Sequence, residues 1–219
     1  ILLGPDFYWG QMNIFIGQNP AATACPMPPP TPPITALPQL ADLARQRLDP
    51  AVWAFLSGGA ADELTLRAST QAWQELPLWP RVLRPLSGGH TRVALAGREL
   101  AHPILLAPVA LQRLLHPEGE WASALAAAAQ GAGVILSTQT SVPMQRVAQA
   151  VLGDAGRGPL WFQLYWQMDR GFNQALVQQA ESAGFEAIVL TVDAPVQGVR
   201  DAERQAGFAP PAGIHAVHL

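Results

Sequence analysis

The amino-acid sequence predicts an α/β fold whose strands form a parallel sheet, and three observations lead to this fold class. Short apolar runs alternate with longer segments of helical periodicity from about residue 104 onward. These runs begin about every 26 to 30 residues, a spacing that suits βα units with parallel strands. Hydrophobic residues make up 49% of the 219-residue chain and charged residues 13%, so the chain can bury a sizeable core.

The start of the chain is predicted to lie outside this fold. Residues 1–37 are interpreted as a Pro-rich, disordered leader, and residues 38–219 as the folded domain. The run from Pro26 to Pro33 favours extended polyproline conformations, which make no helix or sheet hydrogen bonds. The alternative is that apolar residues near the start of the leader form a docking patch.

Three helices are predicted before the sheet. The first covers residues 40–48, where leucines recur at helical spacing. The second helix is predicted to begin after Asp49, which directly precedes a proline, as an N-cap precedes a Pro at the first helical position. This helix is predicted to end at Gly58–Gly59. Asp62 is predicted to cap the third helix, which runs to about Glu75.

A hairpin and the βα units follow. Two short alternating runs meet at Gly97 and predict a β-hairpin. The next apolar run, Ile104–Ala107, is expected to be buried on both faces and to end at Pro108, which has no N–H to donate. The predicted strands are Ile104–Ala107, Val134–Ser137, Leu160–Leu164 and Ala187–Val192, and the helices between them are Glu120–Gln130, Pro143–Leu152 and Gly171–Ala183.

The loops at the carboxyl ends of parallel strands are where such folds bind ligands. The loop after Pro108 leads to Glu118 and Glu120, whose carboxylates suit the free N–H groups in the first turn of the following helix. We therefore expect the functional residues at this edge of the sheet.

Charge and cysteine content exclude several functions. The net charge is -3 and all 13 basic residues are arginines, so nucleic-acid binding is not expected and lysine Schiff-base chemistry is excluded for this chain. The single Cys25 provides neither a disulfide nor a cysteine-based zinc site, which fits a reducing compartment. No apolar stretch is long enough to span a membrane and no basic signal region is present, so the chain is predicted to be cytoplasmic.

Several segments, in this order, carry a resemblance to a known family: Ser57–Glu63, Ala107–Ala110 with His116–Glu120, Leu136–Thr138, Trp161–Tyr165, Ala183–Pro195 and Gly198–Arg200. On these segments the chain resembles the FMN-dependent 2-hydroxy-acid oxidases and dehydrogenases, which include glycolate oxidase, lactate oxidase and mandelate dehydrogenase. The resemblance runs from about Leu40 to Arg200. It implies a (β/α)8 TIM barrel, of which about four βα units are present, a half barrel preceded by N-terminal helices and a hairpin.

The resemblance also implies a cofactor, FMN, and residues that bind it. Pro108, Val109 and Ala110 match the segment that lies against the flavin near N5. Ser137, Gln163 and Thr191 match residues that hydrogen-bond the polar edge of the flavin ring, a task suited to neutral side chains with both donors and acceptors. Taken singly, these three are also typical of ordinary loop or helix-capping residues.

For the substrate, the resemblance implies a small 2-hydroxy acid that is oxidised to the 2-oxo acid by hydride transfer to flavin N5. Tyr165 matches a tyrosine near the hydroxy acid, and Arg200 an arginine near its carboxylate, although an isolated arginine in a polar run is usually solvated. Phe55 stands where the family usually has a substrate-binding tyrosine, and Gln139 where many members have an aromatic residue.

No catalytic residue is assigned, because the family's catalytic histidine is expected beyond the C-terminus of this sequence. His116 is expected to order its own loop, and His215 and His218 to lie in a frayed end rather than in a metal site. The chain by itself is therefore expected to be inactive. The expected partners are a further copy of the chain in a homo-oligomer or a complementing C-terminal half.

Two alternatives remain open from the sequence. In the first alternative the chain is a catalytically inactive, truncated remnant of the family. In the second it is an unrelated TIM barrel that binds phosphate. Flavin affinity would separate the FMN-dependent oxidoreductase from the unrelated barrel.

Overall fold

The computed structural model describes residues 34–193 and 196–219. The chain divides into two compact units, one ending at Leu48 and one spanning Asp49–Leu219. In the first unit, helix α1 (Pro38–Arg47) covers most of the first predicted helix. The predicted leader lies outside the described residues except for residues 34–37, which are exposed.

The second unit begins with two helices, α2 (Pro50–Ser57) and α3 (Leu64–Gln74). The predicted cap of α2 is confirmed, because the Asp49 side chain accepts a hydrogen bond from the backbone N–H of Ala51 at 2.8 Å. The predicted cap of α3 by Asp62 is wrong. Glu63 is the N-cap, with a left-handed φ of 58°, and its carboxylate reaches back to the N–H of Gly59 at 3.0 Å. Because Glu63 adopts the left-handed conformation, α3 begins one residue later than predicted and Asp62 does not occupy the N-cap position.

The hairpin is confirmed as an antiparallel pair of β1 (Val93–Leu95) and β2 (Arg98–Leu100). Ala96 and Gly97 between them have φ values of 48° and 79°, as a tight hairpin turn of this handedness requires. Arg98 ties the hairpin to the segment before the last strand of the main sheet through the Glu186 carboxylate at 2.7 Å, and Arg157 binds the same carboxylate at 2.6 Å. Partial burial by itself would raise the pKa of the Glu186 carboxyl, but the hydrogen bonds and charges of the two arginines outweigh burial and lower this pKa.

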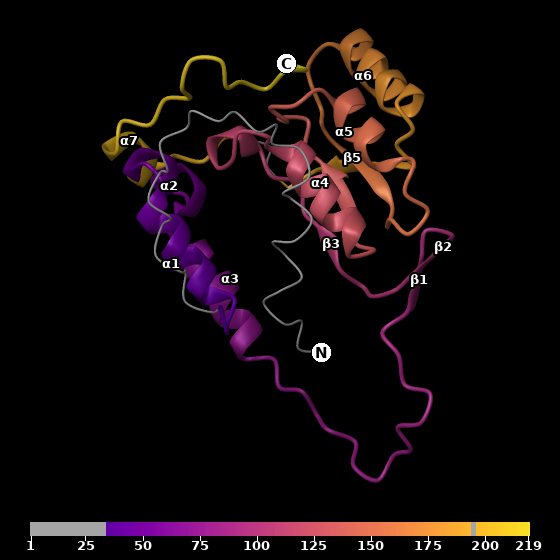
Figure 1. Ribbon diagram of the computed structural model, residues 1–219. Helices are drawn as coiled ribbons and strands as arrows, with labels where there is room; N and C mark the ends of the chain where they lie inside the picture. Colours follow the sequence, from indigo (N-terminus) through magenta and orange to yellow (C-terminus); the bar gives the residue numbers. More distant parts are fainter. Residues whose placement is uncertain (1–33, 194–195) are drawn as a thin grey trace, which may run out of the picture. The chain divides into compact units, whose positions relative to one another are not determined.

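Four strands form the main sheet in the order β3-β4-β5-β6, and all neighbours are parallel. Helices α4 to α6 connect successive strands and gather beside the sheet (Figure 1). The α/β class with parallel strands is therefore confirmed, while the half barrel stays a prediction. The bounds are β3 (Leu105–Leu106), η2 (Gln112–Leu114), α4 (Glu120–Ala129), β4 (Gly133–Leu136), α5 (Met144–Val151), β5 (Leu160–Tyr165), α6 (Arg170–Ser182), β6 (Ala187–Thr191) and α7 (Asp201–Gln205).

The buried core lies between the sheet and helices α4 to α6. Alternate residues of a strand point to opposite faces, so one set of strand residues faces these helices. Small residues on α4 and α5 allow the helices to approach the sheet closely. The core residues are Val134, Leu136, Leu160, Phe162 and Leu164 from the strands and Ala124, Ala127, Ala128, Met144, Val147, Ala148, Val151, Leu176 and Ala180 from the helices.

The prediction that the first strand is buried on both faces is wrong. Ile104 is 60% exposed and Leu106 39% exposed, because β3 stands at an edge of the sheet and pairs with β4 alone. Strand β6 forms the other edge, and its Ile188 and Leu190 are 40% and 50% exposed. Among the residues that the structure describes, no helix has the length and apolar character needed to cross a membrane.

Candidate functional site

The predicted ligand-binding residues of the main sheet lie at the carboxyl ends of its strands, and this end of the sheet is called the edge below. Pro108 follows β3, Ser137 directly follows β4, Gln163 lies near the end of β5 and Thr191 ends β6. Because the four strands are parallel, their carboxyl ends meet at the same edge of the sheet. The structure thus brings together residues that are separated by 83 positions along the chain, from 108 to 191.

Three of these side chains form a continuous hydrogen-bonded chain across the ends of β4, β5 and β6. The Ser137 hydroxyl donates to Oε1 of Gln163 at 3.3 Å, and Nε2 of Gln163 donates to Oγ1 of Thr191 at 2.8 Å. The backbone N–H of Thr138 also donates to Oε1 of Gln163 at 3.1 Å, and this obligatory donor fixes the orientation of the amide. We call these three side chains, Ser137, Gln163 and Thr191, the polar row.

The polar row is neutral, and the donor and the acceptor of each of its hydrogen bonds are defined. Gln163 is 1% exposed and Ser137 4% exposed, so both are held inside the protein. The backbone N–H of Gln139 donates to Ser137 Oγ at 3.0 Å, which leaves the serine proton for Gln163. At the other end, the Thr191 hydroxyl accepts from Gln163 and keeps its own proton for a further acceptor.

Thr138 also lies at this edge, although no role in the site is predicted for it from the sequence. Its hydroxyl donates to the Gln163 carbonyl oxygen at 2.6 Å and accepts from the N–H of Tyr165 at 3.0 Å. Thr138 is fully buried and thereby joins the end of β4 to the end of β5. Its sequence signals are its place directly after Ser137, behind a buried strand, and its position in the family-like segment Leu136–Thr138.

The loop after β3 lies against the loop after β4. The backbone N–H of Leu111 donates to the Gln139 carbonyl oxygen at 3.0 Å, so the segment Pro108–Ala110 is held beside the polar row. Val109 is 41% exposed. This loop therefore presents a small apolar surface next to neutral donors and acceptors.

A buried carboxylate holds the two loops together. Glu120 is 1% exposed and accepts hydrogen bonds from Gln112 N at 3.0 Å, from Ser141 N at 2.9 Å and from Ser141 Oγ at 2.7 Å. Glu120 stands in the first turn of α4, as predicted, but its oxygens accept their hydrogen bonds from donors of the two loops. The loop-ordering role expected for His116 is confirmed, since its Nδ1 accepts from the N–H of Glu118 at 3.3 Å.

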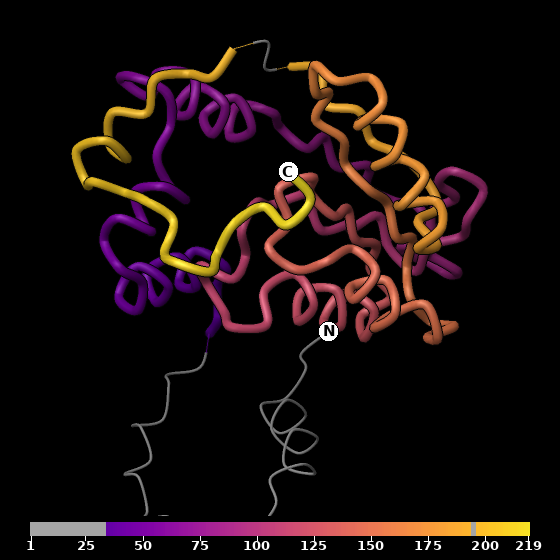
Figure 2. The backbone as a smooth tube through the Cα atoms, turned by 90° about the horizontal axis from the view of Figure 1, so that it is seen from above, coloured from indigo at the N-terminus to yellow at the C-terminus, as the bar shows by residue number. Residues whose placement is uncertain are grey.

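The final residues of the sequence also contact this edge. His218 Nε2 accepts a hydrogen bond from the N–H of Met144 at 3.0 Å, and the N–H of Val217 donates to the Thr140 carbonyl oxygen at 3.0 Å. In Figure 2 the C-terminal segment, in yellow, returns to this part of the chain. Burial lowers the pKa of the His218 imidazole, which agrees with its role as an unprotonated acceptor. The prediction of a frayed end at His218 is therefore wrong.

Two of the predicted substrate residues, Phe55 and Arg200, contact each other. Arg200 Nε binds Glu203 Oε2 at 2.6 Å, and Arg200 Nη2 donates to the Phe55 carbonyl oxygen. The Phe55 ring stacks on Phe208 with 4.5 Å between the ring centroids. Among the described residues, no hydrogen bond joins this cluster to the polar row.

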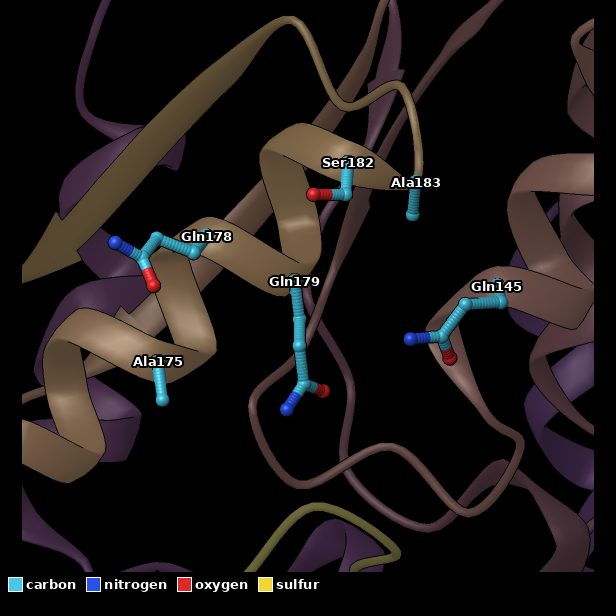
Figure 3. A pocket seen from close by; sticks show the side chains of 6 residues that line it. All are labelled: Gln145, Ala175, Gln178, Gln179, Ser182 and Ala183. Carbon is cyan, nitrogen blue, oxygen red and sulfur yellow. The ribbon is translucent and has the colours of Figure 1, made fainter.

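The remaining predicted substrate residue, Tyr165, ends β5 and is 38% exposed, at the same edge as the polar row. Gln139 is exposed there as well. A separate hollow lies between α5 and α6 (Figure 3). None of the predicted site residues lines it. Its lining is Gln145, Ala175, Gln178, Gln179, Ser182 and Ala183.

Comparison with known proteins gives the family of the chain. A family model described as FMN-dependent dehydrogenase matches residues 44–219. An L-lactate oxidase of Roseobacter sp. (strain GAI101) is 43% identical over 176 residues, which are 80% of this chain and 46% of that protein. A 4-hydroxymandelate oxidase of Amycolatopsis orientalis is 42% identical over 183 residues, 82% of this chain and 50% of that protein.

A solved structure agrees with these sequence matches. A mandelate oxidase mutant with the C4a-OH-FMN adduct superimposes with a TM-score of 0.77 and 40% identity, over 83% of this chain and 53% of that one. The chain spans about half the length of the curated relatives that it matches.

Proposed function

The chain belongs to the family of FMN-dependent dehydrogenases, and on that premise we propose that it is part of an oxidoreductase acting on a small 2-hydroxy acid. The product is the corresponding 2-oxo acid. The relatives named above are oxidases of lactate and 4-hydroxymandelate, both of which are 2-hydroxy acids. Family membership argues against the alternative of an unrelated phosphate-binding barrel.

The polar row is the observation that carries the proposal. Its neutral donors and acceptors across three strand ends suit the polar edge of a flavin ring, and no charged side chain belongs to it. The residues therefore fit FMN. We propose that Ser137, Gln163 and Thr191 bind that polar edge and that Pro108, Val109 and Ala110 lie against the ring. FMN, when bound, supplies the acceptor for the hydride.

Substrate binding is proposed for Tyr165, Phe55 and Arg200. The planar guanidinium of Arg200 suits a carboxylate, since its N–H groups can bind both oxygens. Phe55 has no hydroxyl, so any hydrogen bond from this position to the substrate is lost, at a net cost of about 0.5 to 1.5 kcal/mol for an ordinary bond. Gln139 places a polar side chain at the same edge, where it would favour a polar substituent on the substrate.

No described residue is proposed as the base that removes the hydroxyl proton. His116 and His218 accept backbone hydrogen bonds, and the Nε2 atom of His102 lies 2.9 Å from the Gln130 carbonyl oxygen. We propose that turnover needs a complementing C-terminal half and that the chain by itself is inactive. The competing proposal, an inactive remnant, predicts no gain of activity on complementation. The cytoplasmic location expected from the sequence stays a prediction.

A matched pair of threonine variants tests the flavin site. Thr191→Val removes the hydroxyl at the end of the polar row, and Thr70→Val removes an exposed hydroxyl on α3 with the same change of shape. Titration with FMN, followed by the visible flavin absorbance, should show that Thr191→Val weakens binding by about tenfold. Thr70→Val should bind like the unaltered protein. No flavin binding by the unaltered protein, or equal binding by both variants, would refute the proposed site.

A further inference from the structure

Arg200 uses part of its hydrogen-bonding capacity within the protein. A guanidinium has five N–H donors. Nε binds Glu203 Oε2 at 2.6 Å, and one N–H of Nη2 donates to the Phe55 carbonyl oxygen. No described residue is recorded as a partner of Nη1. The outer edge of the guanidinium, formed by Nη1 and the second N–H of Nη2, is therefore left to bind a ligand.

The C-terminal end of α2 helps to hold this cation. The last carbonyl groups of a helix have no partner within the helix and lie at the negative end of its dipole. Phe55 is in the last turn of α2, so its carbonyl oxygen is such a group. The Phe55 ring adds a contact, because the guanidinium carbon of Arg200 lies 5.8 Å from the ring centroid.

Glu203 lies one helical turn from Arg200, so the ion pair is local. Arg200 is the N-cap of α7, and the side chains of Arg200 and Glu203 are 28% and 24% exposed. With Nε bound by the carboxylate and Nη2 by the Phe55 carbonyl oxygen, the plane of the guanidinium has little freedom to turn.

We propose that Glu203 is a positioning residue, which together with the C-terminal end of α2 orients Arg200 so that its outer edge receives the carboxylate of a monocarboxylate ligand. The inference rests on the proposed function, since it assumes that Arg200 binds the 2-hydroxy acid. It adds that affinity for the acid depends on the hydrogen bond from Nε to Glu203. The negative charge of Glu203 is not required for this role.

The test compares three variants of the flavin-loaded protein. Glu203→Ala removes the acceptor, Glu203→Gln keeps an acceptor oxygen and removes the charge, and Asp201→Ala is the matched control. Asp201 is on the same short helix and forms a comparable pair with Arg204 at 3.5 Å. The ligands are lactate and lactamide, which differ only in the carboxylate. Binding is measured by the ligand-induced shift in melting temperature and by perturbation of the flavin spectrum.

We expect Glu203→Ala to weaken lactate binding by about tenfold and to leave lactamide binding unchanged. Glu203→Gln should stay within about twofold of the unaltered protein, because its amide oxygen still accepts from Nε. Asp201→Ala should bind both ligands normally.

Other outcomes would overturn the proposal. Equal weakening of lactate and lactamide binding would mean that Glu203 only stabilises the fold, and tighter lactate binding by Glu203→Ala would mean that Glu203 competes with the ligand. An unaltered protein that binds the two ligands equally would remove Arg200 itself from the substrate site. That last result would leave the flavin site untouched, because the threonine variants test it separately.

Discussion

Single side chains at the edge of the sheet hold together loops that are distant in sequence. Glu120 accepts hydrogen bonds from Gln112 and Ser141, and Thr138 joins the ends of two strands. His218 has a similar role for the C-terminal segment, because its Nε2 accepts the N–H of Met144 at the start of α5. These contacts join the loops to one another and the C-terminal segment to the start of α5. The contact of His218 depends on an unprotonated Nε2 atom.

The stability contributed by His218 should therefore depend on pH. Burial lowers its native pKa below the ordinary value of 6.5, so the unfolded state binds more protons once the pH falls below about 6.5. The contribution is complete above that pH and is lost as the pH falls from there through the lowered native pKa. We expect His218→Leu to cost about 1 kcal/mol of unfolding free energy at pH 7.5 and less at pH 5.

Urea denaturation at several pH values measures this difference. His215→Leu is the control, because His215 is exposed and no hydrogen bond to its ring is recorded among the described residues. A gap between the unaltered protein and His218→Leu that stays constant from pH 7.5 to pH 5 would contradict the assigned role.

At the scale of elements, the strands of the main sheet approach one another closely at their amino-terminal ends. Gly158, before β5, lies against the backbone at the start of β4. A Cβ atom at Gly158 would lie 2.4 Å from the Ala132 carbonyl carbon and 2.4 Å from the Gly133 nitrogen. Backbone atoms cannot move aside as a flexible side chain can. The pairing of β4 with β5 therefore requires glycine at this position.

Gly158→Ala should lower the unfolding free energy by about 2 to 4 kcal/mol, because the added methyl group pushes two strands apart. Gly153→Ala is the matched control, since a Cβ atom there meets nothing within 4 Å. The control should stay within about 0.5 kcal/mol of the unaltered protein. Thermal or urea unfolding followed by circular dichroism gives both values, and similar stability of the two variants would argue against a close approach of the two strands at Gly158.

At the scale of the whole molecule, the main sheet has two edge strands with exposed apolar side chains. In β6, Ile188 and Leu190 lie on the same face of the sheet as the buried residues Phe162 and Leu164 of β5. Helices cover this face at β5, but Ile188 and Leu190 are exposed. Edge strands with apolar surface favour association with other chains. We therefore expect the chain by itself to self-associate or to have low solubility.

Leu190→Lys should reduce this self-association, because a charge on the exposed face of β6 opposes burial against a second chain. Sedimentation velocity over a range of concentrations should show that the variant needs about tenfold more protein to associate. Leu78→Lys changes a leucine that is 95% exposed and outside the sheet, and it should behave like the unaltered protein. A monodisperse unaltered protein at all concentrations would refute the expectation.

Much of the fold can be predicted from the sequence. The order of strands and helices from α1 to β6, the hairpin at Gly97 and the cap at Asp49 follow from local patterns, because periodicity and turn chemistry act between residues close in the chain. The short helices η2 and α7 are not among the predicted elements. The placement of polar residues after buried strands also predicts their common edge, since parallel strands end on the same side. The bounds of the elements differ from the predicted bounds by few residues.

Which side chains meet at the site was decided by the tertiary structure. The Thr138–Gln163, Met144–His218 and Phe55–Arg200 contacts join residues that are 25, 74 and 145 positions apart. A local sequence pattern is the same whether such a side chain meets a distant partner or water. The sequence by itself determined the longer helices, the strands, their order and the end of the sheet at which polar side chains collect. The tertiary structure alone decided the partners of Glu120 and His218 and the contact of Arg200 with Phe55, because each of these hydrogen bonds joins different segments of the chain, which come together only in the folded structure.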